Sequence, residues 1–300
     1  MGPTAAGKTG IAVELVSRLP LEIISVDSAM VYRGMDIGTA KPDAETLAVA
    51  PHRLIDIRDP WESYSVADFL TDARQAIRAI QAAGRVPLLT GGTMMYFNAL
   101  VRGLAPLPDA DPEIRRRLEA RAGEVGWPAL HQQLAQVDPA AAARIQPTDP
   151  QRIERALEVF EITGQPISEL QKQPGEPLPG RLLSLAVAPP HRAVLHQRIE
   201  QRFVQMLEQG FIEEVSRLRQ DPRLNRETPS MRSVGYRQVW QYLDGDFGRD
   251  ELLLRGVAAT RQLAKRQLTW LRREPDAEWV DPLQSQTVDA LVRKMSLFIG

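Results

Sequence analysis

The sequence contains no cysteine and only four histidines in 300 residues. The absence of cysteine excludes disulfide bonds and thiolate metal sites. The histidines, at positions 52, 131, 191 and 196, are too scattered to show the spacing of metal ligands. We therefore expect surface or core roles for them.

Long apolar runs and a strong net charge are also absent. No stretch approaches the roughly 20 apolar residues that a membrane-spanning helix needs, and the N-terminus lacks the pattern of a secretion signal. We therefore expect a cytoplasmic protein with no membrane partner. The net charge of −1 argues against a protein that is basic throughout. Nucleic-acid binding, however, depends on local basic faces and not on the sum of charges.

A phosphate-binding pattern, G-x-x-x-x-G-K-[ST], stands at the start of the chain. It comprises Gly2, Pro3, Thr4, Ala5, Ala6, Gly7, Lys8 and Thr9. The glycines let the backbone curl so that its amide groups point inward at an anion. Lys8 adds a mobile positive charge, Thr9 adds a hydroxyl for Mg²⁺, and a helix that begins here adds the positive end of its dipole.

The context expected around such a loop is a buried strand before it and an amphipathic helix after it. Apolar residues between Ile11 and Leu19 predict the helix. The strand before Gly2 is missing from the sequence, and we expect its loss to expose the edges of neighbouring strands.

Four apolar, β-rich runs lie at residues 21–26, 53–57, 86–89 and 182–187, with helix-length segments between several of them. This alternation is typical of an α/β fold with a parallel sheet flanked by helices, here of the P-loop NTPase-like type. Such sheets bind ligands at the carboxyl ends of their strands.

The alternation breaks after residue 108, where helices punctuated by prolines continue to a turn-rich segment at residues 173–180. We predict a first part of the core at 1–108 and an all-helical insertion domain at 109–178. The second part of the core, with C-terminal basic helices, is predicted at 179–300.

Asp27 follows the predicted strand 21–26 and should lie at the same edge of the sheet as the glycine loop. An acid there faces the phosphate crevice, but aspartate after a strand is also common as a cap or turn residue, so both interpretations stay open. The strand at 86–89 leads into a glycine turn, residues 91–93, without a metal-holding aspartate. The layout of a simple ATPase is therefore incomplete.

Several strings, in the same order along nearly the whole chain, resemble the bacterial tRNA dimethylallyltransferase family. They are the glycine loop at 2–9, Ser25-Val26-Asp27-Ser28, the string YRGMDIGTAKP at 32–42, PHRLID at 51–56, Gly91-Gly92-Thr93 and SVGYR at 233–237. Members of this family carry a short strand before the glycine loop, and this chain departs from them there.

The resemblance implies transfer of a dimethylallyl group from its diphosphate to N6 of the adenosine 3′ to the anticodon (position 37), in tRNAs that read codons beginning with U. Diphosphate is released, so the loop cradles it and no phosphoryl group moves. By resemblance, Asp27 is the base that accepts the N6 proton, and Thr4 and Lys8 complete the catalytic set. Thr9 is the expected Mg²⁺ ligand.

Access to N6 requires the adenine to leave its stack, and RNA recognition calls for cations together with groups that hold splayed bases. Segments 151–155, 232–237 and 265–272 fit this need. The predicted tRNA-binding residues are Asp27, Ser28, Ala29, Met30, Thr93, Arg115, Gln151, Arg152, Ile153, Glu154, Arg155, Arg232, Ser233, Val234, Gly235, Tyr236, Arg237, Lys265, Arg266, Gln267, Leu268, Thr269, Trp270, Leu271 and Arg272.

Other interpretations accompany this one. An isolated basic helix is more often a solvated face packed on the core, and Tyr236, Trp240 and Trp270 are individually more typical of core residues. Two other functions also fit parts of the sequence: a small-molecule kinase that uses ATP, and a non-catalytic, nucleotide-gated RNA-binding protein. We expect a monomer whose partners are dimethylallyl diphosphate and the anticodon stem-loop of tRNA.

Overall fold

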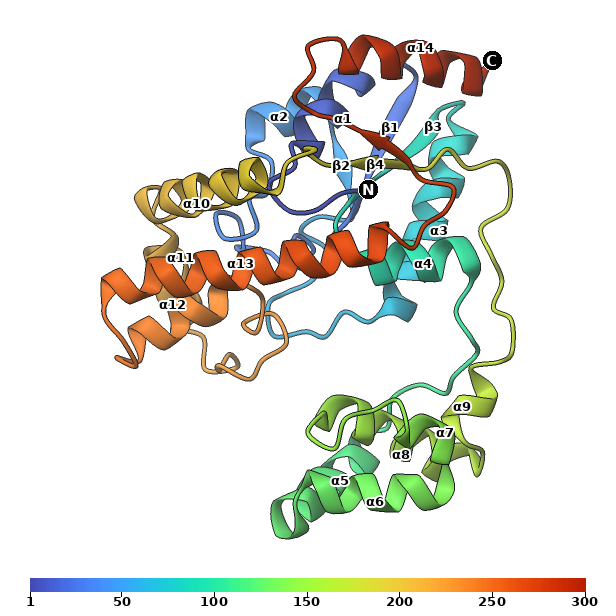
Figure 1. Cartoon of the computed structure of the whole chain (residues 1–300), viewed down its shortest axis with the longest axis vertical. Helices are drawn as coiled ribbons and strands as arrows, with labels where there is room; N and C mark the ends of the chain where they lie inside the picture. The colour runs from blue at the N-terminus through green and yellow to red at the C-terminus, as the bar shows by residue number, and fades with distance from the viewer. The chain divides into compact units, whose positions relative to one another are not determined.

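The computed structural model describes all 300 residues, which form two compact units (Figure 1). The α/β unit comprises Met1–Asn98 and Gly180–Gly300, and the helical unit comprises Ala99–Pro179. No helix in either unit combines the length and the apolar character needed to cross a membrane.

The helical unit begins within α4 (Met94–Arg102), ahead of the predicted boundary at residue 109. The outgoing and returning chains pair here, because the Leu178 amide donates a hydrogen bond to the Leu100 carbonyl at 3.0 Å. The backbones also approach closely, since a Cβ on Gly103 would lie 2.4 Å from the carbonyl carbon of Gly175.

Parallel strands form the centre of the α/β unit. The first sheet has the order β2 (His52–Arg53), β1 (Leu21–Val26), β3 (Val86–Gly91), and both pairings are parallel. A second parallel sheet joins β4 (Leu185–Val187) to β5 (Glu278–Val280). The predicted α/β class, with a small parallel sheet, is confirmed. Strand β5 has only three residues, Glu-Trp-Val, two of them with exposed side chains, and is too short to show an apolar β-rich run in the sequence.

The strand predicted at 53–57 is wrong beyond its first residue. Only His52 and Arg53 pair with β1. Leu54 has a φ of 63° and Asp56 a φ of 53°, and this left-handed backbone ends the extended conformation. Apolar composition alone does not predict a left-handed backbone at these positions.

Met1, the residue before the glycine loop, lies beside β4. Its backbone nitrogen donates to the Leu185 carbonyl at 2.8 Å, and the Val187 amide donates to the Met1 carbonyl at 2.8 Å. Gly2 comes so close to this strand that a Cβ on it would lie 2.3 Å from the Val187 carbonyl oxygen. Main-chain contacts therefore anchor the start of the loop.

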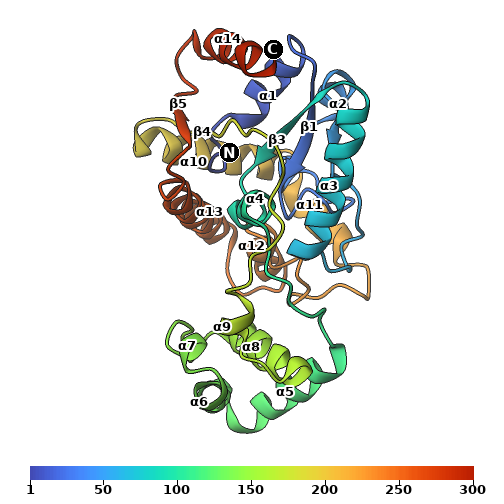
Figure 2. The ribbon, with the colours of Figure 1, turned by 90° about the vertical axis from the view of Figure 1, so that its right-hand side faces the viewer.

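Helices flank the first sheet. Helix α1 (Lys8–Val16) packs on one side of strands β1 and β3, and helix α3 (Val66–Ala82) packs on the other side (Figure 2). A capping box starts α3, because Ser65 and Asp68 each accept a hydrogen bond from the other's backbone amide. The helices lying wholly within the α/β unit are α1 (Lys8–Val16), α2 (Ala44–Val49), α3 (Val66–Ala82), α10 (Arg192–Glu208), α11 (Phe211–Leu218), α12 (Tyr236–Leu243), α13 (Arg249–Leu271) and α14 (Thr287–Ile299).

A buried carboxylate, Glu214, ties the loop after Met35 to α11. It accepts hydrogen bonds from the backbone amides of Asp36, Ile37 and Gly38 at 3.0, 2.7 and 3.2 Å. The Tyr236 hydroxyl donates to the same carboxylate at 2.5 Å. Burial, reinforced by the charge of Glu214, raises the pKa of Tyr236 well above its usual value, so the phenol remains a donor.

The helical unit consists of short helices, most of which begin at a proline. Asp111, Asp138 and Asp149 cap three of them with side-chain hydrogen bonds to backbone amides. The prolines that punctuate this part of the sequence therefore start helices. Those helices are α5 (Pro112–Val125), α6 (Trp127–Val137), α7 (Pro139–Ala142), α8 (Pro150–Thr163) and α9 (Ile167–Leu170).

Replacement of Glu214 by alanine is expected to lower the free energy of unfolding by about 3–5 kcal/mol, because three amides and a hydroxyl lose their buried acceptor. Urea denaturation followed by circular dichroism measures the change. Glu213→Ala, at the exposed neighbouring acid, is the matched control and should stay within about 0.5 kcal/mol of the wild type. Equal unfolding midpoints for the two variants would contradict the assignment.

Candidate active site

The glycine loop turns tightly into α1. Ala5 has a φ of 60° and Gly7 a φ of 87°, both in the left-handed region, and α1 begins at Lys8. The first amides of a helix lack partners within it and carry the positive end of the dipole. Loop and helix together therefore present a surface suited to an anion.

Lys8 lies against this loop, and its Nζ donates to the Pro3 carbonyl at 2.7 Å. Burial lowers the pKa of Lys8 to about 8. The Asp27 carboxylate opposes this effect, and the Arg202 guanidinium adds a smaller lowering. Lys8, Asp27 and Arg202 thus form one electrostatic group.

The ends of β1 and β3 lie side by side, with Val26 paired with Gly91. A Cβ on Gly91 would lie 2.0 Å from the Val26 carbonyl oxygen, so this approach requires glycine. Just beyond the strands, the Thr93 amide donates to the Val26 carbonyl at 3.2 Å, and the Ser28 amide donates to the Thr93 hydroxyl at 3.0 Å. The residues after β1 and β3 are therefore held together at one edge.

Asp27 has the turn-forming role that was one of the two left open by the sequence. Its Oδ1 accepts hydrogen bonds from the amides of Ala29 and Met30 at 2.9 and 3.2 Å, which is a turn-forming arrangement. Its Oδ2 accepts none, and the side chain is half-buried. One oxygen fixes the orientation of the carboxylate while the other stays available to accept a proton.

Arg202, on α10, completes the electrostatic group, and sequence reasoning missed it. Burial lowers the pKa of Arg202 and the charge of Asp27 counteracts this shift. The residue lies between Gln201 and Phe203 on a helix without any local motif, so no sequence signal distinguished it from the surrounding charged residues. Only the packing of α10 beside the glycine loop shows its place.

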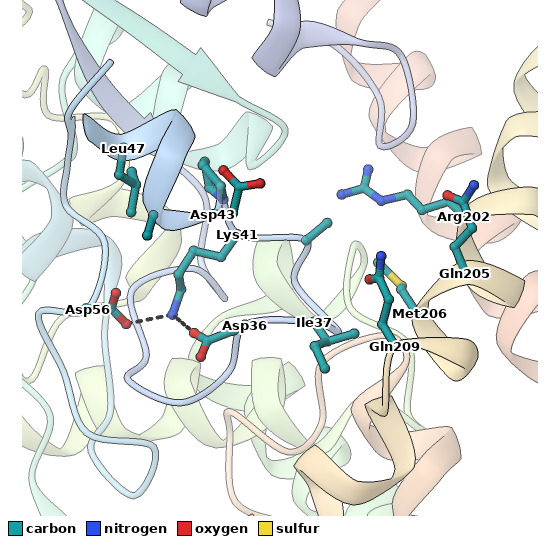
Figure 3. Close-up of a pocket in the computed structure, with 13 residues that line it drawn as sticks. Asp36, Ile37, Lys41, Asp43, Leu47, Asp56, Arg202, Gln205, Met206 and Gln209 are labelled. Carbon is teal, nitrogen blue, oxygen red and sulfur yellow. Dashed lines mark hydrogen bonds and ion pairs between the residues drawn. The ribbon is translucent and has the colours of Figure 1, made fainter. Parts of the chain in front are cut away.

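Arg202 also lines a pocket of about 710 Å³ between α10 and the loop that leads into α2 (Figure 3). Ile37 from the loop and Met206 from α10 supply apolar surface. Lys41 forms part of the opposite wall, where its Nζ donates to Asp36 at 2.5 Å and to Asp56 at 2.6 Å. This ion-paired lysine fixes the loop, whereas no ion pair fixes Arg202.

Helical spacing predicts a basic side of α13 with Arg261, Lys265 and Arg272, and an apolar side with Ala264, Leu268 and Leu271. Ala264 and Leu271 are buried, whereas Lys265, Arg266 and Trp270 are exposed. The predicted division of this helix into an apolar and a basic side is confirmed. The exposed side offers cations and an indole ring to a ligand.

Other members of the predicted tRNA-binding set are exposed as well. Arg232 and Arg237 flank the start of α12 in the α/β unit. Gln151 and Arg152 lie at the start of α8 in the helical unit. Their side chains are accessible within their own units.

Four residues predicted to bind tRNA have buried side chains, so direct contact by them does not fit the structure. Leu271 is 0% exposed on the inner side of α13. Ile153 is 0% exposed in the core of the helical unit. Tyr236 is 0% exposed and donates to Glu214. Gln267 is 8% exposed and faces inward from α13. An aromatic or polar residue within a basic string still packs inward when helical periodicity turns it toward the core.

Arg115 and Arg155, which are also in the predicted tRNA-binding set, both bind the buried carboxylate of Glu158. Arg115 donates to its two oxygens at 2.8 and 3.1 Å, and Arg155 donates to it at 2.6 Å. Burial works to raise the pKa of Glu158, but the bonds from the two arginines outweigh it, and the pKa is lowered. The two arginines therefore serve the fold of the helical unit.

The fold and this site are typical of an α/β protein with an anion-binding loop at the carboxyl edge of parallel strands. The model of the IPP transferase family matches residues 30–274. This chain therefore belongs to the IPP transferase family.

Individual relatives agree. The chain is 61% identical over 301 residues to a tRNA dimethylallyltransferase of Alkalilimnicola ehrlichii, covering 100% of this chain and 94% of that protein. It is similar to the crystal structure of the Bacillus halodurans tRNA isopentenylpyrophosphate transferase, with a TM-score of 0.72 and 39% identity over 99% of this chain and 94% of the other. A eukaryotic dimethylallyltransferase acting on tRNA shares the fold, with a TM-score of 0.82 and 24% identity over 99% and 77% of the chains.

Replacement of Arg115 by alanine is expected to destabilise the protein by about 1–2 kcal/mol, because Glu158 stays buried with one cation instead of two and Arg115 is itself partly exposed. Arg116→Ala, at the exposed adjacent arginine, is the control and should change stability by less than about 0.5 kcal/mol. Thermal unfolding compares the two. A loss of tRNA affinity by Arg115→Ala at unchanged stability would restore its assignment as an RNA contact.

Proposed function

We propose that this enzyme transfers a dimethylallyl group from dimethylallyl diphosphate to N6 of the adenosine 3′ to the anticodon, in tRNAs that read codons beginning with U. The observation that carries the proposal is the free Asp27 oxygen in one electrostatic group with Lys8 and Arg202. A base and two cations are what this alkyl transfer requires. Family membership and the 61% identical relative support it, and they do not favour a kinase.

The largest demand of the reaction is stabilisation of the leaving diphosphate. The bond between the allylic carbon and its oxygen breaks, and negative charge develops on the anion while the five-carbon group gains positive character. Amides of the glycine loop, Lys8 and Arg202 are preorganised donors for that charge. Ile37 and Met206, in the pocket beside Arg202, offer apolar surface to the five-carbon group.

Asp27 serves the nucleophile. As N6 bonds to the allylic carbon, its proton passes to the free Oδ2 of Asp27 and then to solvent. A positioned general base contributes roughly 10²- to 10⁴-fold to such a step. The two amides that bind Oδ1 keep the carboxylate in place throughout.

Mg²⁺ fits this donor set as a partner of the substrate. Thr9 offers an exposed side chain with one hydroxyl, and the structure contains no cluster of three carboxylate or histidine side chains that could hold a metal by itself. Protein sites for Mg²⁺ commonly use one or two protein oxygens with substrate phosphates and water. We infer that the Thr9 hydroxyl would hold the ion, which would help to neutralise the charge of the leaving diphosphate.

The RNA contacts that we propose are the exposed members of the predicted set. Lys265, Arg266 and Arg272 suit phosphates, and Trp270, which is 41% exposed, suits a splayed base. In the helical unit, Gln151 and Arg152 are candidates for further contacts to the anticodon stem-loop.

The finer features of the architecture belong to the same proposal. We infer that the α/β unit is a P-loop NTPase-like core and that the helical unit is an insertion in it, which the glycine loop before α1 and the parallel strands support. We also expect a cytoplasmic location, and we expect a monomer because one chain contains the whole proposed site.

Asp27→Asn is expected to lower kcat by about 10²- to 10⁴-fold, because asparagine accepts the two turn hydrogen bonds but does not take up the N6 proton. The measurement is transfer of labelled dimethylallyl diphosphate to a tRNA whose last anticodon base and next base are adenosines, in the presence of Mg²⁺. Binding of that tRNA should be retained. Unchanged turnover would remove Asp27 from the role of base, and formation of ADP from ATP would point to a kinase instead.

Lys8→Met and Arg202→Met are each expected to raise KM for the diphosphate donor by about 10- to 100-fold, since a charge-assisted hydrogen bond contributes about 1.5–3 kcal/mol. KM for tRNA should change little. Arg192→Met, at the exposed first residue of α10, is the control for the loss of a positive charge on the same helix. Equal donor KM values for Arg202→Met and the wild type would remove Arg202 from the diphosphate site.

A further inference from the structure

Gln267 joins three segments of the α/β unit that are far apart in sequence. Its Oε1 accepts a hydrogen bond from the Thr4 amide of the glycine loop at 2.8 Å. Its Nε2 donates to the carbonyl of Gly92, in the turn after β3, at 2.9 Å. The side chain is 8% exposed and belongs to α13. One amide group thus bridges the loop, the turn and the helix.

The hydrogen bond from Gln267 to Gly92 requires a glycine at position 92. A Cβ on Gly92 would lie 2.3 Å from Gln267 Nε2 and 3.2 Å from the Gly2 carbonyl oxygen. Position 267 also needs a side chain that accepts a hydrogen bond from the Thr4 amide and donates one to the Gly92 carbonyl. Glutamine does both, whereas ionised glutamate lacks the donor and methionine lacks both groups. The position therefore needs glutamine for its hydrogen-bonding chemistry as well as its size.

The same helix presents its exposed side chains on the other side. Lys265 and Arg266 immediately precede Gln267 and are exposed, and Trp270 follows one turn later. A ligand that binds these side chains contacts the same helix whose buried Gln267 side-chain amide is hydrogen-bonded to Thr4 and Gly92. These two hydrogen bonds connect α13 directly to the glycine loop and to the turn that carries Thr93.

We infer that Gln267 is a positioning residue that couples tRNA binding on α13 to the geometry of the diphosphate cradle. The inference rests on the proposed function. In this role Gln267 touches neither substrate: it sets the glycine loop relative to the strand edge that bears Asp27 and Thr93. Misplacement of reacting groups by about 1 Å costs on the order of 10²-fold in rate, so a residue of this kind affects turnover without a contact to the reacting atoms.

The first test replaces Gln267 by methionine, which has a similar length but cannot form either hydrogen bond. Gln75→Met, at an exposed glutamine of α3, is the matched control. The donor dissociation constant is measured with and without tRNA, and kcat and both KM values are determined well below the melting temperature of each variant. Because coupling between two ligands is reciprocal, it can be read from either one.

For Gln267→Met we expect kcat to fall by about 10- to 100-fold while KM for tRNA stays within about 3-fold. The effect of tRNA on donor affinity, present in the wild type and in Gln75→Met, should disappear. Unchanged kcat, or coupling equal to that of the wild type, would overturn the inference. An inactive wild type would instead count against the proposed function.

A second variant separates positioning from a general loss of stability. Gln267→Glu keeps the acceptor for the Thr4 amide, but at neutral pH its carboxylate faces the Gly92 carbonyl, and two acceptors repel. Protonation of the introduced carboxyl restores a donor, and such surroundings raise its pKa. The activity of Gln267→Glu relative to the wild type should therefore rise as the pH falls from about 8 to about 6. A constant ratio over this range would contradict the role of the Gly92 hydrogen bond.

Discussion

Val26, at the end of β1, lies opposite Gly91 at the end of β3, and the two backbones approach so closely that a Cβ on Gly91 would meet the Val26 carbonyl oxygen at 2.0 Å. The rest of the site depends on this pairing. It makes both strands end at one edge, so that Asp27 follows one strand and Thr93 the other. The glycine loop completes that edge through α1, which packs on the same two strands.

The charged side chains at this edge comprise two cations and one anion, and this excess of positive charge suits the proposed reaction. Lys8 and Arg202 are both cations whose pKa values burial lowers, and Asp27 is the anion that opposes the shift in each. Buried charge without full compensation is costly in the folded protein. A bound diphosphate supplies the missing negative charge, so the substrate is expected to stabilise the folded protein as it binds.

Two buried carboxylates, Glu214 and Glu158, hold together segments near the proposed binding surfaces. Glu214 fixes the loop at residues 36–38, which forms a wall of the pocket beside Arg202. Glu158 binds two arginines in the helical unit. Both acids bind residues that were predicted to contact tRNA, including Tyr236 and Arg115. A motif therefore marks a segment that matters, but it does not say which of its side chains face outward.

The sequence by itself determined the α/β class, the glycine loop, the position of Asp27 after a strand and the two-sided character of α13, because each follows from local spacing and periodicity. It did not determine the early end of β2, where two left-handed residues interrupt an apolar run, nor the short strand β5. Only the tertiary structure decided that Arg202 joins the site and that Gln267 bridges the loop and the turn. These contacts join residues about 175 to 265 positions apart, and their distances depend on helix packing, which no local pattern encodes.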